Sequence, residues 1–424
     1  MARSVYARLL VIVALFEITG CGAPDQVDAF PAESRSTALE NEFPGSRGFE
    51  VTHPASGTLE AYASHASATA GDTVDVFVNS TESDDAFFEV YRIGYYQGRG
   101  GRLIRRGASQ HVEPQASCPV DAATGLIECA WQKTFSIALD ESYTTGYYVI
   151  KVIASRGVET RLPLVIREPA PHAPILVQAS TNTWQAYNYW GGTSLYVNFL
   201  SKTEQYAGQR AYRVSYDRPY ALDDGAGALF DQEAWMARWL EQKGYEVAYV
   251  TNIDVDREPS LLLGRKMVFS VGHDEYNSVT TRDAFEAARD AGISLGYYSA
   301  NAGFWRVRQD PSSSGVERRI ITCYKDSSLD PVRDSLETTA QFRQAPFARP
   351  ESLLEGVMYQ AGNAPHSDLP MLVSAPESWV FEGTGVVAME RLANVLGPEW
   401  DQVADEEPAN AEILFDSPAI RKLG

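Results

Sequence analysis

Three polar segments each follow an apolar run that has the composition of a β-strand. They are residues 180–192, 272–276 and 299–305, and together they supply His, Glu, Asn, Tyr and Trp side chains. In open α/β sheets, ligands bind beyond the carboxyl ends of the strands, where segments of this kind meet. The spacing therefore predicts that the three segments line one site.

The residues in these segments exclude several common hydrolase motifs. A serine nucleophile on an α/β sheet needs a G-x-S-x-G turn with a His partner, and the sequence has no such turn. A zinc protease needs H-E-x-x-H, whereas His273 is followed by Asp-Glu-Tyr-Asn. A zinc deaminase shares His-x-Glu but also needs a C-x-x-C pair, which the sequence lacks. Cys323 has no flanking glycine and is typical of a buried structural cysteine.

What remains is a site rich in oxygen donors. Glu275 and nearby tyrosines offer carboxylate and phenolate, hard anionic donors that suit a hard cation such as Fe(III). His273, two residues before Glu275, has the ring needed to carry a proton. Without a metal, the same two residues would form a hydrogen-bonded pair that ties the loop to the sheet. The residue types alone leave both interpretations open.

Alternating strand and helix patterns from residue 175 onward supply the frame for these segments. Strand patterns cover residues 175–178, 246–250, 266–271 and 293–298, and helix patterns cover 230–243 and 280–290. This rhythm indicates a mainly parallel sheet with helices on its faces. We therefore expect residues 175–424 to form an α/β domain.

Residues 49–168 have a different, all-β pattern. Runs of β-branched and aromatic residues at 74–78, 87–93, 147–153 and 162–166 are separated by Gly- and Ser-rich turns. Their spacing predicts an immunoglobulin-like β-sandwich. The Pro-rich residues 169–174 are predicted to link this sandwich to the α/β domain. The expected fold class is therefore a multidomain α+β protein.

Five segments resemble the large (beta) subunit family of N,N-dimethylformamidase, and they occur in the same order as in that family. They are residues 91–103, 182–188, 217–220, 270–276 and 300–305. In that family a β-sandwich precedes an α/β domain similar to the glutamine-amidotransferase fold, which holds one iron bound by two tyrosines and a glutamate. The resemblance implies an Fe(III)-dependent hydrolase of small linear amides, with a small partner subunit or a homo-oligomer as its assembly.

The resemblance also implies roles for individual residues. The metal ligands would be Tyr187, Tyr220 and Glu275, with Tyr216 as the alternative to Tyr220. The catalytic residues would be His273, which passes a proton to the leaving amine, and Asn301, which orients the substrate or donates to the developing oxyanion. The chain ends soon after residues 413–418, where relatives continue with further sheet, so a degenerate, inactive relative is one alternative.

The N-terminus has the pattern of a bacterial lipoprotein signal. Residues 1–21 combine a positively charged start, an apolar run and an Ile-Thr-Gly-Cys ending. The pattern predicts a lipid on Cys21, which alone would anchor the protein to the membrane of the bacterial cell envelope, on its periplasmic or extracellular face. Residues 22–48 are rich in Ala, Pro, Ser and acidic residues and predict a disordered tether. In an exported protein, Cys118 and Cys129 are expected to form a disulfide.

Composition limits the possible partners. The chain has 36 Lys and Arg residues against 56 Asp and Glu residues, which gives a formal net charge of −20. A chain this acidic lacks the basic face that nucleic-acid binding requires, so we expect no nucleic-acid partner. The main alternative to a hydrolase is a non-catalytic envelope module whose aromatic cleft binds carbohydrate or protein. Metal content distinguishes the two hypotheses.

Overall fold

The N-terminal segment folds further toward the terminus than the sequence predicts. The computed structural model describes residues 36–199, 210–334, 336–360, 369–396, 400–404 and 411–416. The predicted signal with Cys21 lies outside the described residues, as does the first part of the tether. From residue 36 the tether prediction is wrong, because helix α1 (Thr37–Glu40) is buried at both of its ends. The backbone N–H of Thr37 donates to Oε1 of Glu246 at 2.8 Å, so a partner 209 positions away holds this polar segment in place.

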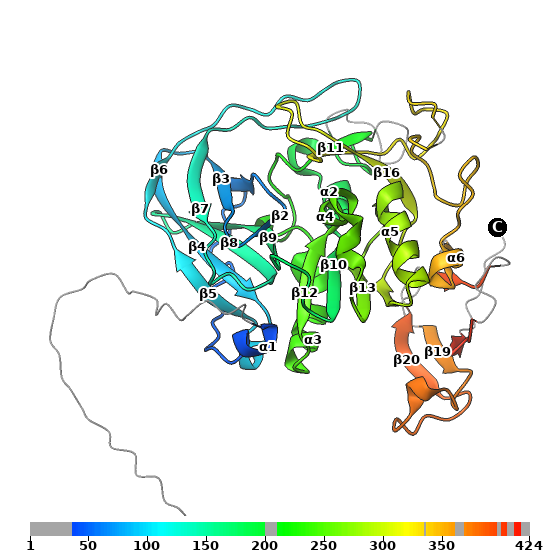
Figure 1. Ribbon diagram of the computed structural model, residues 1–424. Coiled ribbons are helices and arrows are strands. Elements are labelled where there is room, and N and C mark those ends of the chain that lie inside the picture. Colours follow the sequence, from blue (N-terminus) through cyan, green and yellow to red (C-terminus); the bar gives the residue numbers. More distant parts are fainter. Residues whose placement is uncertain are drawn as a thin grey trace, which may run out of the picture. The chain divides into compact units, whose positions relative to one another are not determined.

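Nine strands in two β-sheets make up the N-terminal part of the molecule (Figure 1). The strands are β1 (Leu59–Ala63), β2 (Ser67–Thr69), β3 (Thr73–Ser80), β4 (Asp84–Ile93), β5 (Gly101–Arg106), β6 (Gln110–Val112), β7 (Lys133–Ala138), β8 (Gly146–Ala154) and β9 (Glu159–Arg167). One sheet has the order β1-β3-β7 and the other β2-β9-β8-β4-β5, with β6 paired to β4. The immunoglobulin-like type of this part stays a prediction.

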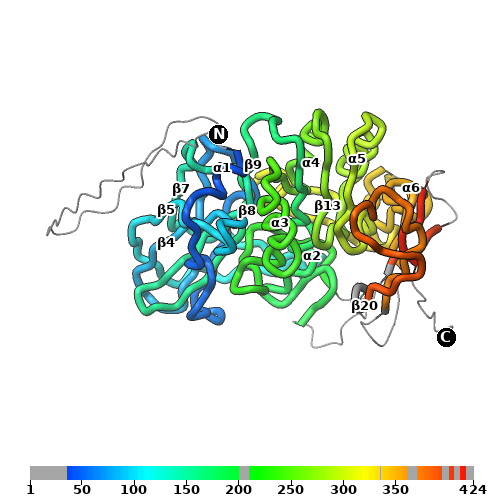
Figure 2. Tube along the Cα trace, turned by 90° about the horizontal axis from the view of Figure 1, so that it is seen from below, coloured from blue at the N-terminus to red at the C-terminus, as the bar shows by residue number. Residues whose placement is uncertain are grey.

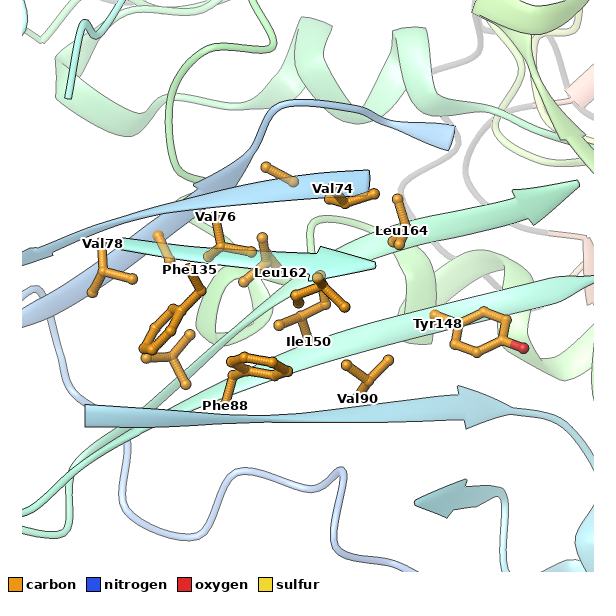
Figure 3. Packing of buried hydrophobic residues seen from close by; sticks show 14 of the residues in the cluster. Val74, Val76, Val78, Phe88, Val90, Phe135, Tyr148, Ile150, Leu162 and Leu164 are labelled. Carbon is orange, nitrogen blue, oxygen red and sulfur yellow. The ribbon is translucent and has the colours of Figure 1, made fainter. Parts of the chain in front are cut away.

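Apolar side chains fill the space between these two sheets (Figure 3). Along β3, Val74, Val76 and Val78 are buried while the residues between them are partly exposed. They face Phe88 and Ile150 of the other sheet. This alternation is the period-2 pattern that a strand with one buried face requires.

A parallel sheet follows directly after residues 168–174, which form neither helix nor strand. Its strands are β10 (Ile175–Ala179), β12 (Val247–Thr251), β13 (Met267–Gly272) and β15 (Ser294–Ser299), in the order β12-β10-β13-β15. Its helices are α2 (Thr181–Tyr187), α3 (Ala234–Gln242), α4 (Asn252–Arg257) and α5 (Val279–Asp290). All pairings in this sheet are parallel, which confirms the predicted α/β arrangement. The likeness to a glutamine-amidotransferase fold stays a prediction.

Strands β10, β12 and β13 of the parallel sheet are buried on both faces, whereas the edge strand β15 is partly exposed. On one face, Val177, Tyr249 and Phe269 share an apolar cluster with α3 and with the outward side of the larger N-terminal sheet. On the other face, Leu176 and Val268 pack with α4 and α5. Burial on both sides explains why these strands are continuous apolar runs in the sequence.

Buried polar contacts also join the N-terminal sheets to the α/β part. The guanidinium of Arg92 on β4 pairs with Glu241 on α3 at 2.7 Å, and both side chains are fully buried. The hydroxyl of Tyr147 on β8 donates to Oε2 of Glu233 at 2.6 Å. The described residues accordingly belong to one compact unit, so the Pro-rich linker marks a change of architecture and not a separation of independent bodies.

The remaining elements extend the α/β part. A second sheet contains β11 (Arg213–Ser215), β14 (Tyr276–Ser278), β16 (Trp305–Asp310) and β17 (Ile320–Thr322). The C-terminal elements are α6 (Ser352–Glu355), β18 (Met358–Gln360), β19 (Leu369–Val373), β20 (Arg391–Leu396), β21 (Trp400–Gln402) and β22 (Phe415–Asp416) (Figure 2). Short turns of 3-10 or π type are η1 (Tyr96–Gly98), η2 (Trp190–Gly192), η3 (Asp223–Gly225), η4 (Leu229–Glu233), η5 (Pro259–Leu262) and η6 (Trp379–Phe381). No helix among the described residues has the length and apolar character needed to cross a bilayer.

Candidate functional site

The three polar segments meet at the carboxyl edge of the parallel sheet, as the strand pattern predicts. The loop after β15 bonds to the loop after β13 through Ala300 N to Gly272 O (3.0 Å) and Gly303 N to Asp274 O (2.9 Å). The loop after β13 in turn bonds to α2, since the N–H of Glu275 donates to Oγ1 of Thr183 at 3.0 Å. Backbone contacts of this kind hold the segments in fixed register.

Two tyrosines and one glutamate form the centre of this edge. The Tyr187 hydroxyl donates to Oε2 of Glu275 at 2.9 Å, and the Tyr196 hydroxyl donates to Oε1 at 2.7 Å. The two hydroxyls are 3.0 Å apart, and their rings stack with centroids 4.3 Å apart. Three oxygen-bearing groups therefore converge on one point, and only Glu275 and Tyr187 among them follow from the sequence.

His273 stands beside this cluster. Its Nε2 lies 3.3 Å from Oε2 of Glu275, and its ring centroid is 5.3 Å from that of Tyr187. This nitrogen is buried and makes no well-oriented hydrogen bond within the described part of the chain. It is therefore positioned to exchange a proton with a group bound next to Glu275.

A cavity of about 110 Å³ opens beside the cluster. Tyr187 and His273 form part of its wall, and Trp184, Asn188 and Tyr220 form another part. Asp231 and Gln232 of η4 also line it. The volume is that of a small organic molecule, so Tyr187 and His273 face a space suited to a substrate of that size.

Lys325 is a cation that no pattern in the sequence predicts at this site. Its Nζ lies 3.4 Å from the centroid of the Tyr196 ring, and the rings of Trp305 and Tyr276 are within 5.3 Å. Burial lowers the pKa of Lys325 to about 8, against the opposing attraction of Glu275. The backbone of Lys325 has a φ of 60°, a strained value for a non-glycine residue. The cation–π contact places the positive charge of Lys325, a residue with a strained backbone, against the ring of Tyr196.

Asp274 fixes the loop that carries His273 and Glu275. Its carboxylate accepts from Nε2 of Gln178 (2.7 Å), Oγ of Ser270 (2.9 Å) and Nδ2 of Asn252 (2.8 Å). Burial raises the pKa of Asp274, and these hydrogen bonds oppose that shift. With all its bonds made inside the sheet edge, Asp274 is a support for the site and has no free face toward the cavity.

Glu233 fixes the start of α2 in the same way. Its Oε1 accepts from the N–H of Ser180 (3.0 Å) and from Nε1 of Trp184 (2.8 Å), while Oε2 accepts from Tyr147. Burial raises the pKa of Glu233 to about 8. Glu233 ends the π-type turn η4, so the single helix predicted over residues 230–243 is wrong in its first turn. The wide turn directs this carboxylate inward while its neighbours line the cavity.

The other predicted residues lie near the cluster without joining it. Tyr220 lines the cavity that Tyr187 and His273 share, and burial raises its pKa. The Tyr216 hydroxyl instead donates to Oδ1 of Asn182 at 2.9 Å. Asn301 is on the loop bonded to Gly272, with a left-handed φ of 50°. The structure thus brings Tyr187, Glu275 and His273 together, and Tyr196 joins them.

No periodic pattern marks the segment of Tyr196, and this explains why sequence reasoning missed it. A local turn brings it back to Tyr187, because Oγ of Ser194 accepts from the N–H groups of Tyr196 and Val197 at 3.1 Å. One signal for this turn is available in the sequence. It is the polar Ser194, which precedes Tyr196 by two positions shortly after a helix.

The cysteines are structural, although Cys323 packs in the same buried cluster as Tyr187 and Tyr196. Cys118 and Cys129 form a disulfide with Cα atoms 4.5 Å apart. Cys323 is a free, buried thiol whose pKa rises to about 11 through burial. Such a thiol is not a nucleophile at neutral pH, in keeping with the structural role predicted for it.

Comparison with known proteins places the chain in a family. Residues 87–422 match the family described as N,N-dimethylformamidase beta subunit-like, C-terminal. The chain is 27% identical over 228 residues to the N,N-dimethylformamidase beta subunit of an Alcaligenes species, and 24% identical over 229 residues to that of Paracoccus aminophilus. Each alignment covers 45% of this chain and 30% of the relative.

Solved structures show only weak likeness. The sporulation control protein Spo0M of Bacillus subtilis has a TM-score of 0.18 and 12% identity, over 27% of this chain and 50% of that chain. A superoxide reductase of Ignicoccus hospitalis has a TM-score of 0.15 and 15% identity, over 26% of this chain and 80% of that chain. Neither carries an argument about fold or function. The family match spans most of the sequence, including every residue of the cluster, and the chain therefore belongs to the N,N-dimethylformamidase beta subunit-like, C-terminal family.

Proposed function

We propose that this protein hydrolyses the C–N bond of small amides at the Tyr187, Tyr196 and Glu275 cluster. The observation that supports it is the convergence of two phenols on one buried carboxylate, with Nε2 of His273 at 3.3 Å from that carboxylate and without a well-oriented hydrogen bond among the described residues. The curated relatives named N,N-dimethylformamidase beta subunit support the same reaction. Because the alignments cover 30% of those relatives, their substrate is only a guide to that of this chain.

The donor set suits Fe(III), the cofactor implied by the family. Among the described residues no three His, Cys, Asp and Glu side chains stand together as a metal site. The cluster instead offers phenol and carboxylate oxygens, which are hard donors when ionised. Their mutual distances of 2.7 to 3.0 Å suit groups that share one small cation. We therefore propose Tyr187, Tyr196 and Glu275 as the ligands, with Tyr196 in place of Tyr220.

When bound, the metal would supply Lewis acidity toward an amide carbonyl and toward water. The protein's own groups do the rest. His273 would move a proton through Nε2 to the departing amine. The aromatic walls of the 110 Å³ cavity, such as Trp184, would hold small alkyl groups and exclude bulk water. Lys325 would favour the ionised form of Tyr196, because its ammonium lies over that ring. Asn301 would orient the substrate from the neighbouring loop.

Iron content and the visible spectrum of the purified protein test the metal centre. We expect one iron per chain with a phenolate charge-transfer band. Tyr187→Phe, Tyr196→Phe and Glu275→Gln should each lose most of the iron. Tyr220→Phe is the matched control, because it changes a tyrosine in the same cavity wall and should keep the iron. Iron-free native protein, or iron that is lost from Tyr220→Phe and kept by Tyr196→Phe, would contradict the proposed ligand set.

Hydrolysis of a small formamide, measured as amine release, tests the role of His273. His273→Ala should keep the iron and lose about 10²–10⁴-fold in rate, the range for a general acid or base. An unchanged rate would remove His273 from the mechanism. Iron-free protein without amidase activity would favour the alternative of a non-catalytic carbohydrate- or protein-binding module.

The location and assembly are part of the proposal. We expect Cys21 to carry a lipid that holds the protein at the bacterial envelope, and we expect a small partner subunit or a homo-oligomer. Fractionation of Cys21→Ser tests the anchor, since this variant should leave the membrane fraction. Light scattering of the purified protein gives its mass and tests the assembly.

A further inference from the structure

A second cavity, of about 30 Å³, lies between the N-terminal sheets and the α/β part. Its lining residues are Tyr62, Ala63, His65, Ala66, Leu162, Pro163, Thr181, Trp184, Tyr216, Arg218, Tyr220 and Arg319. Trp184 and Tyr220 also line the 110 Å³ cavity of the proposed active site, so the two cavities are neighbours that share a wall.

The lining of the smaller cavity is cationic. It includes two arginines and no acidic residue. Arg319 pairs with Asp217 at 2.6 Å, and Asp217 is outside the lining. Arg218 is fully buried and has no ion pair among the described residues. The cavity therefore carries about one uncompensated positive charge.

Three carbonyl oxygens satisfy only part of the Arg218 guanidinium. Nη1 donates to the oxygens of Trp190 (3.2 Å) and Thr193 (3.1 Å), and Nη2 donates to that of Asn188 (2.7 Å). The Nε atom is buried and has no hydrogen-bond partner in the described structure. A buried charge without a counter-charge is costly, and so is a buried donor without an acceptor. An anion in the cavity would offset both costs.

The cavity limits the anion to a small one. A water molecule needs roughly 10–15 Å³ of such space, so about 30 Å³ admits a group of two or three heavy atoms and excludes a phosphate ester. Leu162, Pro163 and Ala66 make part of the lining apolar. A cationic donor beside an apolar wall suits a short carboxylate. Its oxygens can accept hydrogen bonds from the guanidinium, and its carbon end needs no hydrogen-bond partner.

We propose that this cavity is a binding site for a one-carbon carboxylate, formate, at Arg218. The proposal that the cavity binds a carboxylate is based only on the cavity and its positive charge. The identification of the ligand as the acyl product of hydrolysis, leaving through the wall of Trp184 and Tyr220, rests on the proposed function. Product held there would keep the active-site cavity free for the next amide.

Titration of sodium formate into the full protein, followed by tryptophan fluorescence and calorimetry, tests the site. We expect saturable binding, with sodium chloride as the competitor that controls for a general anion effect. Ala66→Leu should fill the cavity without touching Arg218 and should weaken formate binding at least about tenfold, while Ala66→Ser should leave it within about twofold. Arg218→Met, if it folds by circular dichroism, should abolish binding.

Other outcomes would overturn the proposal. They are the absence of saturable formate binding, equal binding to Ala66→Leu and Ala66→Ser, and binding of chloride as tight as that of formate. Iron-depleted protein and Glu275→Gln separate this site from the metal centre. Formate binding that persists in both supports the separate cavity even if the amidase proposal fails, and binding lost in both would place formate at the metal centre.

Discussion

The N-terminal sheets and the carboxyl edge of the parallel sheet bury their residues by opposite means. Between the two N-terminal sheets the buried cluster is mainly aliphatic, from Ala55 to Ile166. At the sheet edge the buried residues are polar, and Gln178, Asp274 and Glu275 are each at most 3% exposed. Equal burial therefore has two effects. The first region gains stability from its buried apolar surface area, whereas the second region uses hydrogen bonds to hold individual side-chain atoms in place.

The polar edge itself contains two kinds of carboxylate. Asp274 and Glu233 accept neutral donors from the surrounding backbone and side chains. Glu275 accepts from Tyr187 and Tyr196, and both hydroxyls belong to residues that are partly exposed. The first kind supports the loops, and the second kind holds Tyr187, which lines the cavity. Variants in each region should separate stability from metal binding.

The largest effect on stability should come from the apolar region. Ile150 is fully buried between the N-terminal sheets. Ile150→Ala should lower the free energy of unfolding by about 2–5 kcal/mol, and the control Ile150→Val by about 0.5–1.5 kcal/mol. Urea unfolding measures both. A metal content that falls as much as stability does would break the distinction between the two regions.

The disulfide should have the next largest effect. Replacing Cys118 and Cys129 by Ser removes the bond that closes this loop and should cost about 2–3 kcal/mol. Thermal unfolding under non-reducing conditions measures the loss, and reduced wild-type protein is the control. A double variant as stable as the oxidised protein would show that local packing alone holds the loop.

Glu233 should give a pH-dependent effect. Its pKa is raised to about 8, so between about pH 4.5 and 8 the folded protein binds one more proton than the unfolded chain. Stability should fall by up to about 1.4 kcal/mol per pH unit across that window. Glu233→Gln keeps the shape and should remove this slope, whereas the exposed control Glu258→Gln should not. If the free energy of unfolding, measured with urea at pH 5 to 8, has the same pH dependence in Glu233→Gln and in the wild type, Glu233 does not control stability.

The smallest effect on stability should come from the cluster itself. Tyr196→Phe deletes one hydrogen bond to Glu275 and should cost only about 1 kcal/mol of unfolding free energy. The same variant should lose most of the bound iron, and this contrast is the sharpest test of the comparison. A large loss of stability with the iron retained would make Tyr196 a structural residue.

Much of this arrangement follows from local pattern. Strand ends locate Glu275 and His273, because a parallel sheet places the carboxyl ends of its strands at one edge. The same rule correctly predicted that Asn301 lies on the neighbouring loop, after β15. The tether prediction failed from Thr37 onward because the partner of that segment, Glu246, is distant in sequence and no local pattern announces it.

The sequence alone determined the four strands of the parallel sheet and the three loops that meet at its edge, because hydrophobic periodicity is a local property of the chain. Only the tertiary structure decided which tyrosines face Glu275 and that Lys325 lies over one of them. It also decided that Arg218 lies between two layers without a counter-charge among the described residues. These facts depend on distances between side chains that are remote in sequence, and such distances exist only after the layers have packed.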